Sequence, residues 1–247
     1  MNKACQKEQD ILRVLVTGGA TCERIDDVRY ITNVSSGKTA VNICEELIKC
    51  ADEQKRFVEV FYLHGKYASI PNYIGKLGNI KSFSYTSFVD LNEMMRNMLG
   101  EIKFNAVIHL AAVSDYSVES VAIGSGAQEQ LLAPNKLSKL SSQEEISLKL
   151  KRNFKIIERI REYDSSKQAM IVGFKLTDSE NPTERKAAVA RLLGSNKGVD
   201  YVVHNDLHDI GEKQHWATIY DAKMAEVERT KNKEELAKFL SNLVIKH

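Results

Sequence analysis

The sequence predicts a three-layer α/β/α fold with a doubly wound, mostly parallel sheet of the Rossmann-like type. Short apolar runs, which suit buried strands, alternate with stretches whose apolar residues recur at helical spacing. Small and polar residues dominate positions 117–135, before an alternating strand at 146–150. We therefore expect a single domain over residues 1–247, with a frayed stretch at 1–10 and a small flap or hairpin appendage at 117–150.

Strands are expected where short apolar runs are bounded by polar residues or glycine, and helices where apolar residues recur every three or four positions. The expected strands cover residues 11–16, 57–63, 80–83, 106–110, 146–150, 170–174 and 199–203, with a weak hairpin at 216–219 and 225–228. One expected helix begins after residue 35 or 36, and others cover 88–98, 154–160, 183–193 and 233–244. Because strands and helices alternate, the strands should pair in parallel and bind ligands beyond their carboxyl ends.

The composition is that of an ordinary globular protein, with 43% hydrophobic and 28% charged residues. The formal net charge of +2 gives no electrostatic reason to expect a nucleic acid or a membrane surface as partner. No apolar run approaches the roughly 18 residues of a membrane span, and residues 1–10 lack the apolar core of a signal peptide. Four cysteines without a C-x-x-C pair favour a reduced, cytoplasmic setting and indicate no metal site.

A long polar loop follows the first expected strand. Residues 17–19 (Thr-Gly-Gly) end that strand, and about fifteen residues then precede the next helix. Ser35 or Ser36 is a natural N-cap for that helix. Free backbone N–H groups and the helix dipole favour an anion there, so this loop is a candidate binding site.

Common nucleotide and nucleophile motifs do not fit this loop. A G-x-G-x-x-G dinucleotide fingerprint would need glycines where Thr21 and Arg24 stand. Residues 37–39 (Gly-Lys-Thr) end like a P-loop, but Thr32 occupies the place of its first glycine. The G-x-S-x-G of a nucleophile elbow is absent from the loop. A plain turn at the end of a strand therefore stays open as the interpretation of the two glycines.

A second polar segment follows the expected strand at 106–110. Residues 111–116 read A-A-V-S-D-Y, so two small residues precede the hydroxyl of Ser114 and the carboxylate of Asp115. Since ligands of parallel sheets bind beyond the carboxyl ends of the strands, this segment and residues 17–19 should share one edge. The alternative is that Asp115 is solvated or caps a turn.

Residues 18–38 fit G-G-A-T-x-E-x-I-D-x-V-R-Y-I-T-N-x-S-S-G-K, and together with A-A-V-S-D-Y they resemble the phosphopantothenate–cysteine ligases of coenzyme A biosynthesis. The resemblance covers about residues 11–245. It implies that a nucleoside triphosphate, CTP before ATP, activates 4′-phosphopantothenate with the help of Mg²⁺, and that L-cysteine attacks the acyl-nucleotide. It also implies a homodimer, and a first strand near residue 11 leads us to expect a stand-alone ligase.

The resemblance assigns roles to the residues at matching positions. Those it implies for nucleotide binding are Gly18, Gly19, Ala111, Ala112, Ser114, Asp115, Lys136, Lys139, Phe174, Lys175 and Asn205. Those it implies for the other substrates are Arg29, Asn33, Ser35, Ser36, Gly37, Lys38 and Ala112. The expected catalytic residues are Asn33, which would act on the acyl-nucleotide, and Lys139 and Lys175.

The lysine-rich flap of the ligases is changed in this chain. Lys139 matches its first lysine, but Ser141 and Ser142 replace the next two. Lys175, at the end of an expected strand, is therefore the favoured replacement for the missing flap lysine. It would bind the nucleotide phosphates as a compact point charge. The alternative for Lys136 and Lys139 is a solvated loop.

Two other functions stay open. A short-chain-dehydrogenase-like NAD(P) oxidoreductase or epimerase would need a catalytic Y-x-x-x-K, a spacing found at Tyr163 and Lys167 but across an expected turn. An inactive nucleotide-binding regulatory protein of the same fold is supported only by the changed flap. Pyrophosphate release with phosphopantothenate, cysteine and each nucleotide separates the three functions.

Overall fold

The computed structural model describes residues 11–72, 76, 78–124, 130–134, 145–194, 198–211 and 214–247. Its main sheet has eight strands in the order β13-β12-β11-β10-β6-β1-β4-β5. In chain order they are β1 (Leu12–Gly18), β4 (Val58–Gly65), β5 (Gly78–Tyr85), β6 (Ala106–His109), β10 (Met170–Thr177), β11 (Tyr201–Asp206), β12 (Ala217–Asp221) and β13 (Glu226–Thr230). The first six pair in parallel, and the last two join the edge in antiparallel pairing.

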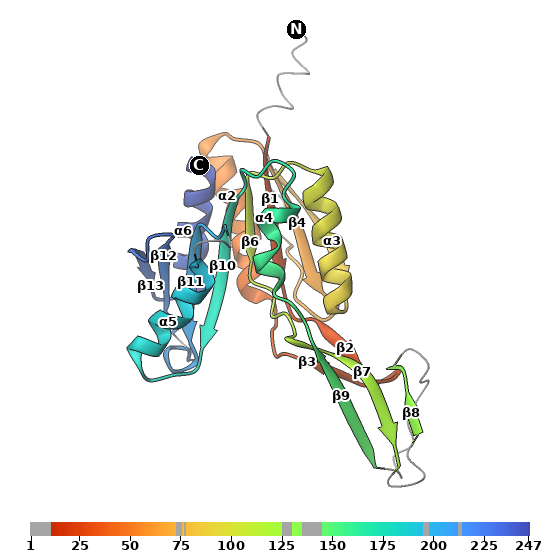
Figure 1. Cartoon of the computed structure of the whole chain (residues 1–247). Coiled ribbons are helices and arrows are strands. Elements are labelled where there is room, and N and C mark those ends of the chain that lie inside the picture. Colours follow the sequence, from red (N-terminus) through yellow and green to blue (C-terminus); the bar gives the residue numbers. More distant parts are fainter. Residues whose placement is uncertain are drawn as a thin grey trace.

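Helices cover both faces of this sheet (Figure 1). On one face lie α2 (Lys38–Gln54) and α6 (Lys233–Lys246), and on the other lie α3 (Phe88–Glu101), α4 (Ile160–Tyr163) and α5 (Pro182–Leu193). Each face has its own apolar core, because successive side chains of a strand point to opposite faces. Val14 and Val16 belong to the core under α2 and α6, and Leu15 belongs to the other. The predicted three-layer, doubly wound fold is confirmed.

The described helices are short. The longest of them, α2, has 17 residues and packs its apolar side on the sheet. Within the described ranges, no helix combines the length and the apolar composition needed to cross a bilayer.

The central strands bring their carboxyl ends to one edge. β1 pairs with both β4 and β6, and Thr17 lies opposite His109. β6 also pairs with β10, where His109 lies opposite Gly173. Beyond the strands, Ala20 and Ala112 form a further parallel bridge. The segments that follow β1 and β6 are therefore neighbours, as expected for a parallel sheet.

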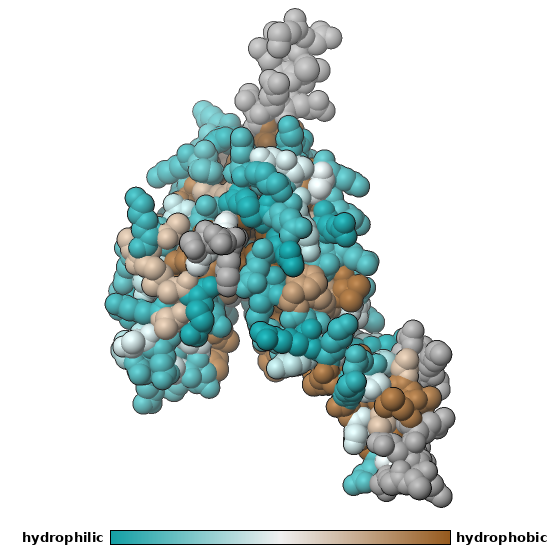
Figure 2. Space-filling view, in the orientation of Figure 1, coloured by the Kyte–Doolittle hydropathy of each residue, from teal (hydrophilic) through white to brown (hydrophobic). Residues whose placement is uncertain are grey.

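A three-stranded antiparallel arm projects from this edge (Figure 1). Its central strand β7 (Tyr116–Ile123) pairs with β8 (Gln130–Leu132) on one side and with β9 (Ile146–Arg152) on the other. A short hairpin of β2 (Cys22–Arg24) and β3 (Tyr30–Thr32) packs against β7. The space-filling view shows brown, apolar surface on the arm (Figure 2).

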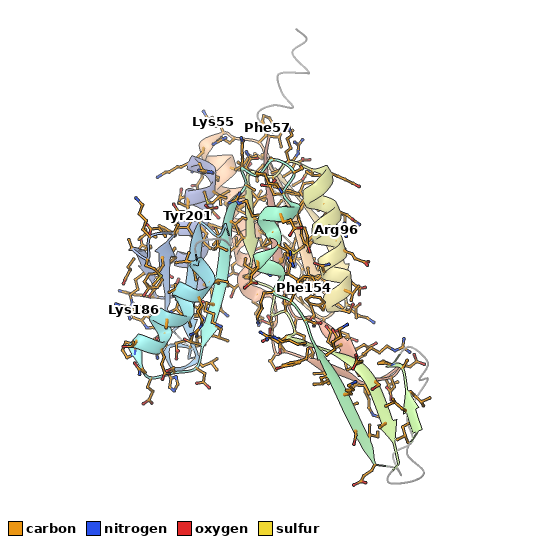
Figure 3. All side chains as sticks on the ribbon, in the orientation of Figure 1. Lys55, Phe57, Arg96, Phe154, Lys186 and Tyr201 are labelled. Atoms are coloured by element: carbon orange, nitrogen blue, oxygen red, sulfur yellow. The ribbon has the colours of Figure 1, made fainter. Side chains whose placement is uncertain are left out.

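A buried carboxylate ties the base of the arm to the body. Glu23 accepts a hydrogen bond from the backbone N–H of Phe88 at 2.9 Å and another from the hydroxyl of Ser117 at 3.0 Å. Phe88 is the first residue of α3, and Ser117 belongs to β7. Figure 3 shows the labelled Phe154 at the same junction. Its ring packs edge to face on that of Phe88, with 5.0 Å between the two ring centroids.

Three local expectations differ from the structure. The loop between β1 and α2 contains the β2–β3 hairpin, so it is not without structure of its own. Much of 117–135 is strand, because β9 supplies a partner from far along the chain that local pattern does not reveal. Residues 154–160 do not form one helix: a 3₁₀ turn at Ile156–Glu158 precedes the single turn of α4.

Candidate active site

The end of β1 makes a close turn beneath α2. A Cβ atom on Gly18 would lie 2.4 Å from Cβ of Ala40, so a side chain there would displace the helix. The Tyr85 hydroxyl donates a hydrogen bond of 2.8 Å to the carbonyl oxygen of Gly18. Gly19 has a φ angle of 80°, in the left-handed region that favours glycine. The turn therefore requires both glycines, and both line a cavity.

The start of α2 lies against this turn. Its N-cap is Gly37, with a φ angle of 73° and no side-chain cap, so the predicted serine cap is wrong. A Cβ atom on Gly37 would lie 3.1 Å from the Tyr62 hydroxyl and 3.3 Å from the nitrogen of Gly19. A glycine thus lets the helix approach the glycine turn. Ser35 and Ser36 line the cavity, and the Ser36 hydroxyl accepts a long hydrogen bond of 3.5 Å from the N–H of Lys38, the first residue of α2.

The segment after β6 forms the second side of the cavity. The N–H of Ala112 donates to the carbonyl of Gly19 at 2.8 Å, which holds this segment against the glycine turn. The amide nitrogen of Asn33 lies 3.4 Å from the carbonyl oxygen of Ala112 and 3.3 Å from that of Val113. Two stretches about eighty residues apart, which carry the two quoted motifs, therefore meet at one place.

Buried polar side chains hold the segment after β6 in position. The Thr17 hydroxyl accepts a hydrogen bond from the N–H of Ala111 at 3.2 Å and lies 2.9 Å from Nδ1 of His109. The Thr21 hydroxyl accepts from the N–H of Ser114 at 2.9 Å. Burial lowers the pKa of the His109 imidazole to about 4, so this ring is neutral at pH 7.

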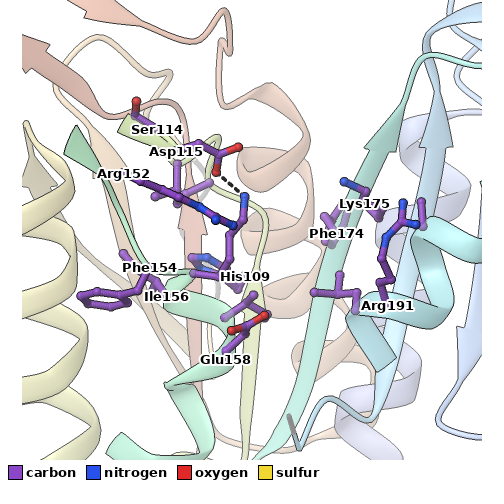
Figure 4. Close-up of a pocket in the computed structure, with 16 residues that line it drawn as sticks. His109, Ser114, Asp115, Arg152, Phe154, Ile156, Glu158, Phe174, Lys175 and Arg191 are labelled. Atoms are coloured by element: carbon purple, nitrogen blue, oxygen red, sulfur yellow. Dashed lines mark hydrogen bonds and ion pairs between the residues drawn. The ribbon is translucent and has the colours of Figure 1, made fainter. Parts of the chain in front are cut away.

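Two adjoining cavities make up the cleft. The larger, of about 590 Å³, lies along the glycine turn, the start of α2 and the segment after β6. The smaller, of about 460 Å³, lies between that segment and α5, and Figure 4 shows its lining. The residues that line both cavities are Ala111, Val113, Asp115, Lys155, Phe174 and Lys175. A ligand at this boundary would contact one carboxylate and two lysines.

Positive charge gathers on both sides of the boundary. Lys155 forms an ion pair with Asp115 on one side, marked by the dashed line in Figure 4. Lys175 and Arg191 lie on the other side. Burial, followed by the charges of Lys155 and Arg191, lowers the pKa of Lys175. The cleft is therefore suited to a ligand that carries several negative charges.

Most of the expected site residues come together in the larger cavity. Those that line it are Gly18, Gly19, Asn33, Ser35, Ser36, Gly37, Lys38, Ala111, Ala112, Asp115, Phe174, Lys175 and Asn205. Asn205 also donates its side-chain amide to the carbonyl of Trp216 at 2.7 Å. Ser114 lines the smaller cavity instead. Lys136 and Lys139 lie outside the described residues.

Among the expected site residues that the structure describes, Arg29 alone lines neither cavity. It belongs to the segment between β2 and β3, and its guanidinium lies 2.5 Å from a carboxylate oxygen of the buried Asp26. The same carboxylate accepts the N–H groups of Val28 and Arg29 at 2.8 and 2.7 Å. Asp26 thus fixes the hairpin turn that carries Arg29.

Sequence reasoning missed one whole side of the cleft. The residues concerned lie at the end of β9, in the segment and 3₁₀ turn that follow it, or on α5, and they are Arg152, Phe154, Lys155, Glu158 and Arg191. The basic run K-L-K-R-N-F-K ending at Lys155 was the available signal, but it follows an alternating strand and resembles an ordinary solvated face. In the part of the chain that the structure describes, no cluster of three or more histidine, cysteine, aspartate or glutamate side chains could hold a metal ion.

The fold and the cleft define a Rossmann-like α/β protein with a cationic site at the carboxyl edge of its parallel sheet. The chain belongs to the family described as the DNA/pantothenate metabolism flavoprotein C-terminal domain, whose model matches residues 10–247.

Relatives at about 30% identity support this assignment. The chain is 31% identical over 228 residues to the coenzyme A biosynthesis bifunctional protein CoaBC of Thermococcus kodakarensis, covering 92% of this chain and 49% of that protein. It is 32% identical over 222 residues to CoaBC of Methanocaldococcus jannaschii, covering 88% and 46%. The chain therefore spans about half the length of the curated relatives it matches.

Solved structures share the fold. The DNA/pantothenate metabolism flavoprotein from Streptococcus pneumoniae superimposes with a TM-score of 0.76 at 28% identity, over 96% of this chain and 100% of that one. A Cab2 mutant in complex with phosphopantothenate-cysteine gives a TM-score of 0.70 at 16% identity, over 98% of this chain and 88% of that one. The second likeness concerns the fold alone.

The Y-x-x-x-K pair that the dehydrogenase-like alternative needs, Tyr163 and Lys167, lies outside the cleft. The Tyr163 hydroxyl donates to the side-chain oxygen of Asn92 at 2.8 Å, and Tyr163 lines a separate cavity beside α3. Lys167 sits in a turn with a φ angle of 57° and donates to the carbonyl of Arg161 at 3.0 Å. Neither residue lines the cleft.

Proposed function

We propose that this chain joins L-cysteine to 4′-phosphopantothenate in a reaction driven by a nucleoside triphosphate, with CTP preferred to ATP. The observation that carries the proposal is that its two ligase-like stretches, residues 18–38 and 111–116, contact each other and line one cationic cleft. The family membership supports the same assignment.

The proposed chemistry has two steps. A carboxylate is a poor electrophile because oxide would have to leave, so the nucleotide first converts the phosphopantothenate carboxylate into an acyl-nucleotide and releases pyrophosphate. The amine of cysteine then attacks the acyl carbon, and the nucleoside monophosphate leaves as the amide forms. Bringing three substrates together is mainly a positioning task, which suits a cleft lined by backbone, amide and lysine groups.

Each lobe of the cleft suits one part of the substrates. The smaller cavity includes the apolar side chains of Phe154, Ile156 and Leu192 and would receive the base of the nucleotide. Lys175, at the boundary, would neutralise charge that develops on the phosphates. The larger cavity would receive phosphopantothenate along residues 35–38.

Asn33 is the proposed ligand of the acyl oxygen. Its side-chain amide offers two donors and does not titrate near pH 7. Its hydrogen bonds to the carbonyls of Ala112 and Val113, at 3.4 and 3.3 Å, are long. The amide can therefore turn toward a substrate oxygen at little cost.

The carboxylates of the cleft fit a magnesium ion carried in by the nucleotide. Protein-bound Mg²⁺ commonly takes one or two carboxylates and completes its shell with substrate phosphates and water. Asp115 lines both cavities and Glu158 lines the smaller one, so Asp115 would hold the ion. When bound, the ion offsets the negative charge of the phosphates.

A homodimer and a cytoplasmic setting belong to the same proposal. The compartment follows from the cysteines. The cysteines of the described residues are unpaired thiols, which fits a reducing compartment.

In the proposed homodimer, Arg29, on the hairpin at the base of the arm, would reach the site of the second copy. Light scattering at several concentrations tests the dimer, and loss of activity in mixed dimers that contain Arg29→Ala tests the shared site.

Pyrophosphate release tests the proposed function. The purified chain is mixed with Mg²⁺, phosphopantothenate, cysteine and one nucleotide at a time, and the amide is identified by mass spectrometry. We expect amide and pyrophosphate in equal amounts, fastest with CTP, and none without phosphopantothenate. Nucleotide binding without pyrophosphate release would instead indicate an inactive regulatory protein. Tight NAD(P)H binding with no nucleotide-dependent turnover would contradict the ligase assignment.

A further inference from the structure

We propose that Lys155 is a second phosphate-binding residue, facing Lys175 across the cleft, and that the triphosphate takes it from Asp115. The inference rests on the proposed function and deepens it, because it names a cation that the ligase resemblance did not supply. Lys155 and Lys175 are the lysines that line both cavities in the described part of the chain.

The backbone around Lys155 is fixed on both sides. Two residues earlier, the N–H of Asn153 donates to the carbonyl of Asp115 at 2.8 Å, and its side-chain amide donates to the carbonyl of Ser114 at 3.1 Å. Immediately afterwards, Ile156 and Ile157 are buried in the core beside α3 and α5. The freedom of Lys155 therefore lies mainly in its side chain, which points into the cleft.

Lys155 already binds an oxyanion in the structure. Its ammonium group pairs with the carboxylate of Asp115, and the two side chains are 51% and 57% exposed. An exposed ion pair contributes little to stability, so exchanging its partner costs little. A triphosphate offers several charged oxygens in place of one carboxylate, and charge-assisted hydrogen bonds to it are correspondingly strong.

The other charges of the cleft favour the same exchange. Lys155, Lys175 and Arg191 line the smaller cavity together, and the charges of Lys155 and Arg191 lower the pKa of Lys175, so an anion between these side chains would offset their mutual repulsion. A triphosphate at the boundary of the two cavities would contact both lysines at once. The exchange also frees the Asp115 carboxylate at the position where the metal carried by the nucleotide would need it.

Equilibrium binding of CTP, measured by titration calorimetry without the other substrates, tests the inference. Lys155→Gln should weaken CTP binding by about tenfold or more in Mg²⁺ buffer, as expected for loss of a charge-assisted contact. It should change cytidine binding by less than about twofold, because cytidine carries no phosphate. The matched control is Lys151→Gln, an exposed lysine of β9 that lines neither cavity and should bind CTP as the unmodified chain does.

Asp115→Asn tests the exchange itself. Without Mg²⁺, this change removes the competitor for Lys155, so CTP should bind more tightly and Lys155→Gln should cost more in this background than alone. With Mg²⁺, the same change removes a metal ligand, so CTP should bind more weakly. An effect of Asp115→Asn with one sign in both buffers would overturn the exchange.

The remaining outcomes separate this inference from the proposed function. Tight CTP binding that Lys155→Gln leaves unchanged would overturn the role of Lys155 and leave the ligase proposal standing. Equal weakening of CTP and cytidine by Lys155→Gln would show that the residue shapes the cavity and does not bind phosphate. No binding of any nucleotide by the unmodified chain would overturn both. Thermal unfolding without ligand checks that each variant is folded.

Discussion

Replacing His109 by glutamine should remove a pH-dependent part of the stability of this fold. His109 ends β6, is buried, and lies 2.9 Å from the Thr17 hydroxyl through Nδ1. Burial lowers the pKa of its imidazole from 6.5 to about 4. Glutamine keeps a polar side chain at this position but does not titrate.

The direction and size of the effect follow from that shift. In the unfolded chain the imidazole titrates near its ordinary value, so between pH 6.5 and about 4 the unfolded chain binds a proton that the folded chain does not. The free energy of unfolding therefore falls as the pH is lowered through this window and is fully retained above it. From pH 7 to pH 5 the loss due to His109 should be about 2 kcal/mol.

Urea unfolding at pH 5, 6, 7 and 8 measures this loss. The unmodified chain should lose about 2 kcal/mol more than His109→Gln between pH 7 and pH 5. His208→Gln is a control of opposite sign, because the hydrogen bond to Asp206 raises the pKa of His208 and its contribution is lost as pH rises. Parallel pH profiles for the unmodified chain and His109→Gln would refute the reasoning, since they would mean that the folded state accepts the proton as readily as the unfolded state.

Three further changes should have distinct outcomes. Gly18→Ala should lower the free energy of unfolding by about 1–3 kcal/mol, because its Cβ would lie 2.4 Å from that of Ala40; an unchanged urea midpoint would show that α2 can shift. Lys175→Ala should lower the rate of pyrophosphate release by about 10²-fold, and a kinetically silent variant would move the phosphate site elsewhere. Asn33→Ala should let the acyl-nucleotide accumulate in quenched single-turnover reactions while amide formation falls about 10²-fold; near-normal amide formation would contradict the role of Asn33.

The fold was predictable because its buried strands are short apolar runs between polar segments. The apolar runs at Val14 to Val16 and Val107 to Ile108 predict buried strands. Because strands alternate with helices along the chain, they also predict a parallel sheet with its site at the carboxyl edge. Most of the candidate site followed, since residues directly after two neighbouring parallel strands must share that edge.

The parts that sequence missed depend on partners distant in the chain. β7 exists as a strand through its pairing with β9, and no local pattern in its small residues shows that partner. Gly37 takes the cap position that Ser35 or Ser36 was expected to fill, because the helix must approach Gly19. Lys155 lies at the cleft because Asn153, two residues earlier, is hydrogen-bonded to the carbonyls of residues 114 and 115. These are tertiary contacts, which the local sequence does not show.

The packing of α6 on α2 has a consequence for synthesis of the chain. Leu240 and Val244 of α6 are buried in the same core as Ile43 and Leu47 of α2, and the guanidinium of Arg56 donates to the carbonyl of Ile245, 189 positions later. At ribosomal rates, roughly 10 to 40 seconds separate the emergence of these two segments. The part of the apolar surface of α2 that α6 covers therefore stays exposed for that time. Nascent chains stalled before α6 should therefore be held by chaperones or aggregate through this surface, whereas the pairing of β1 with β4 can form much earlier.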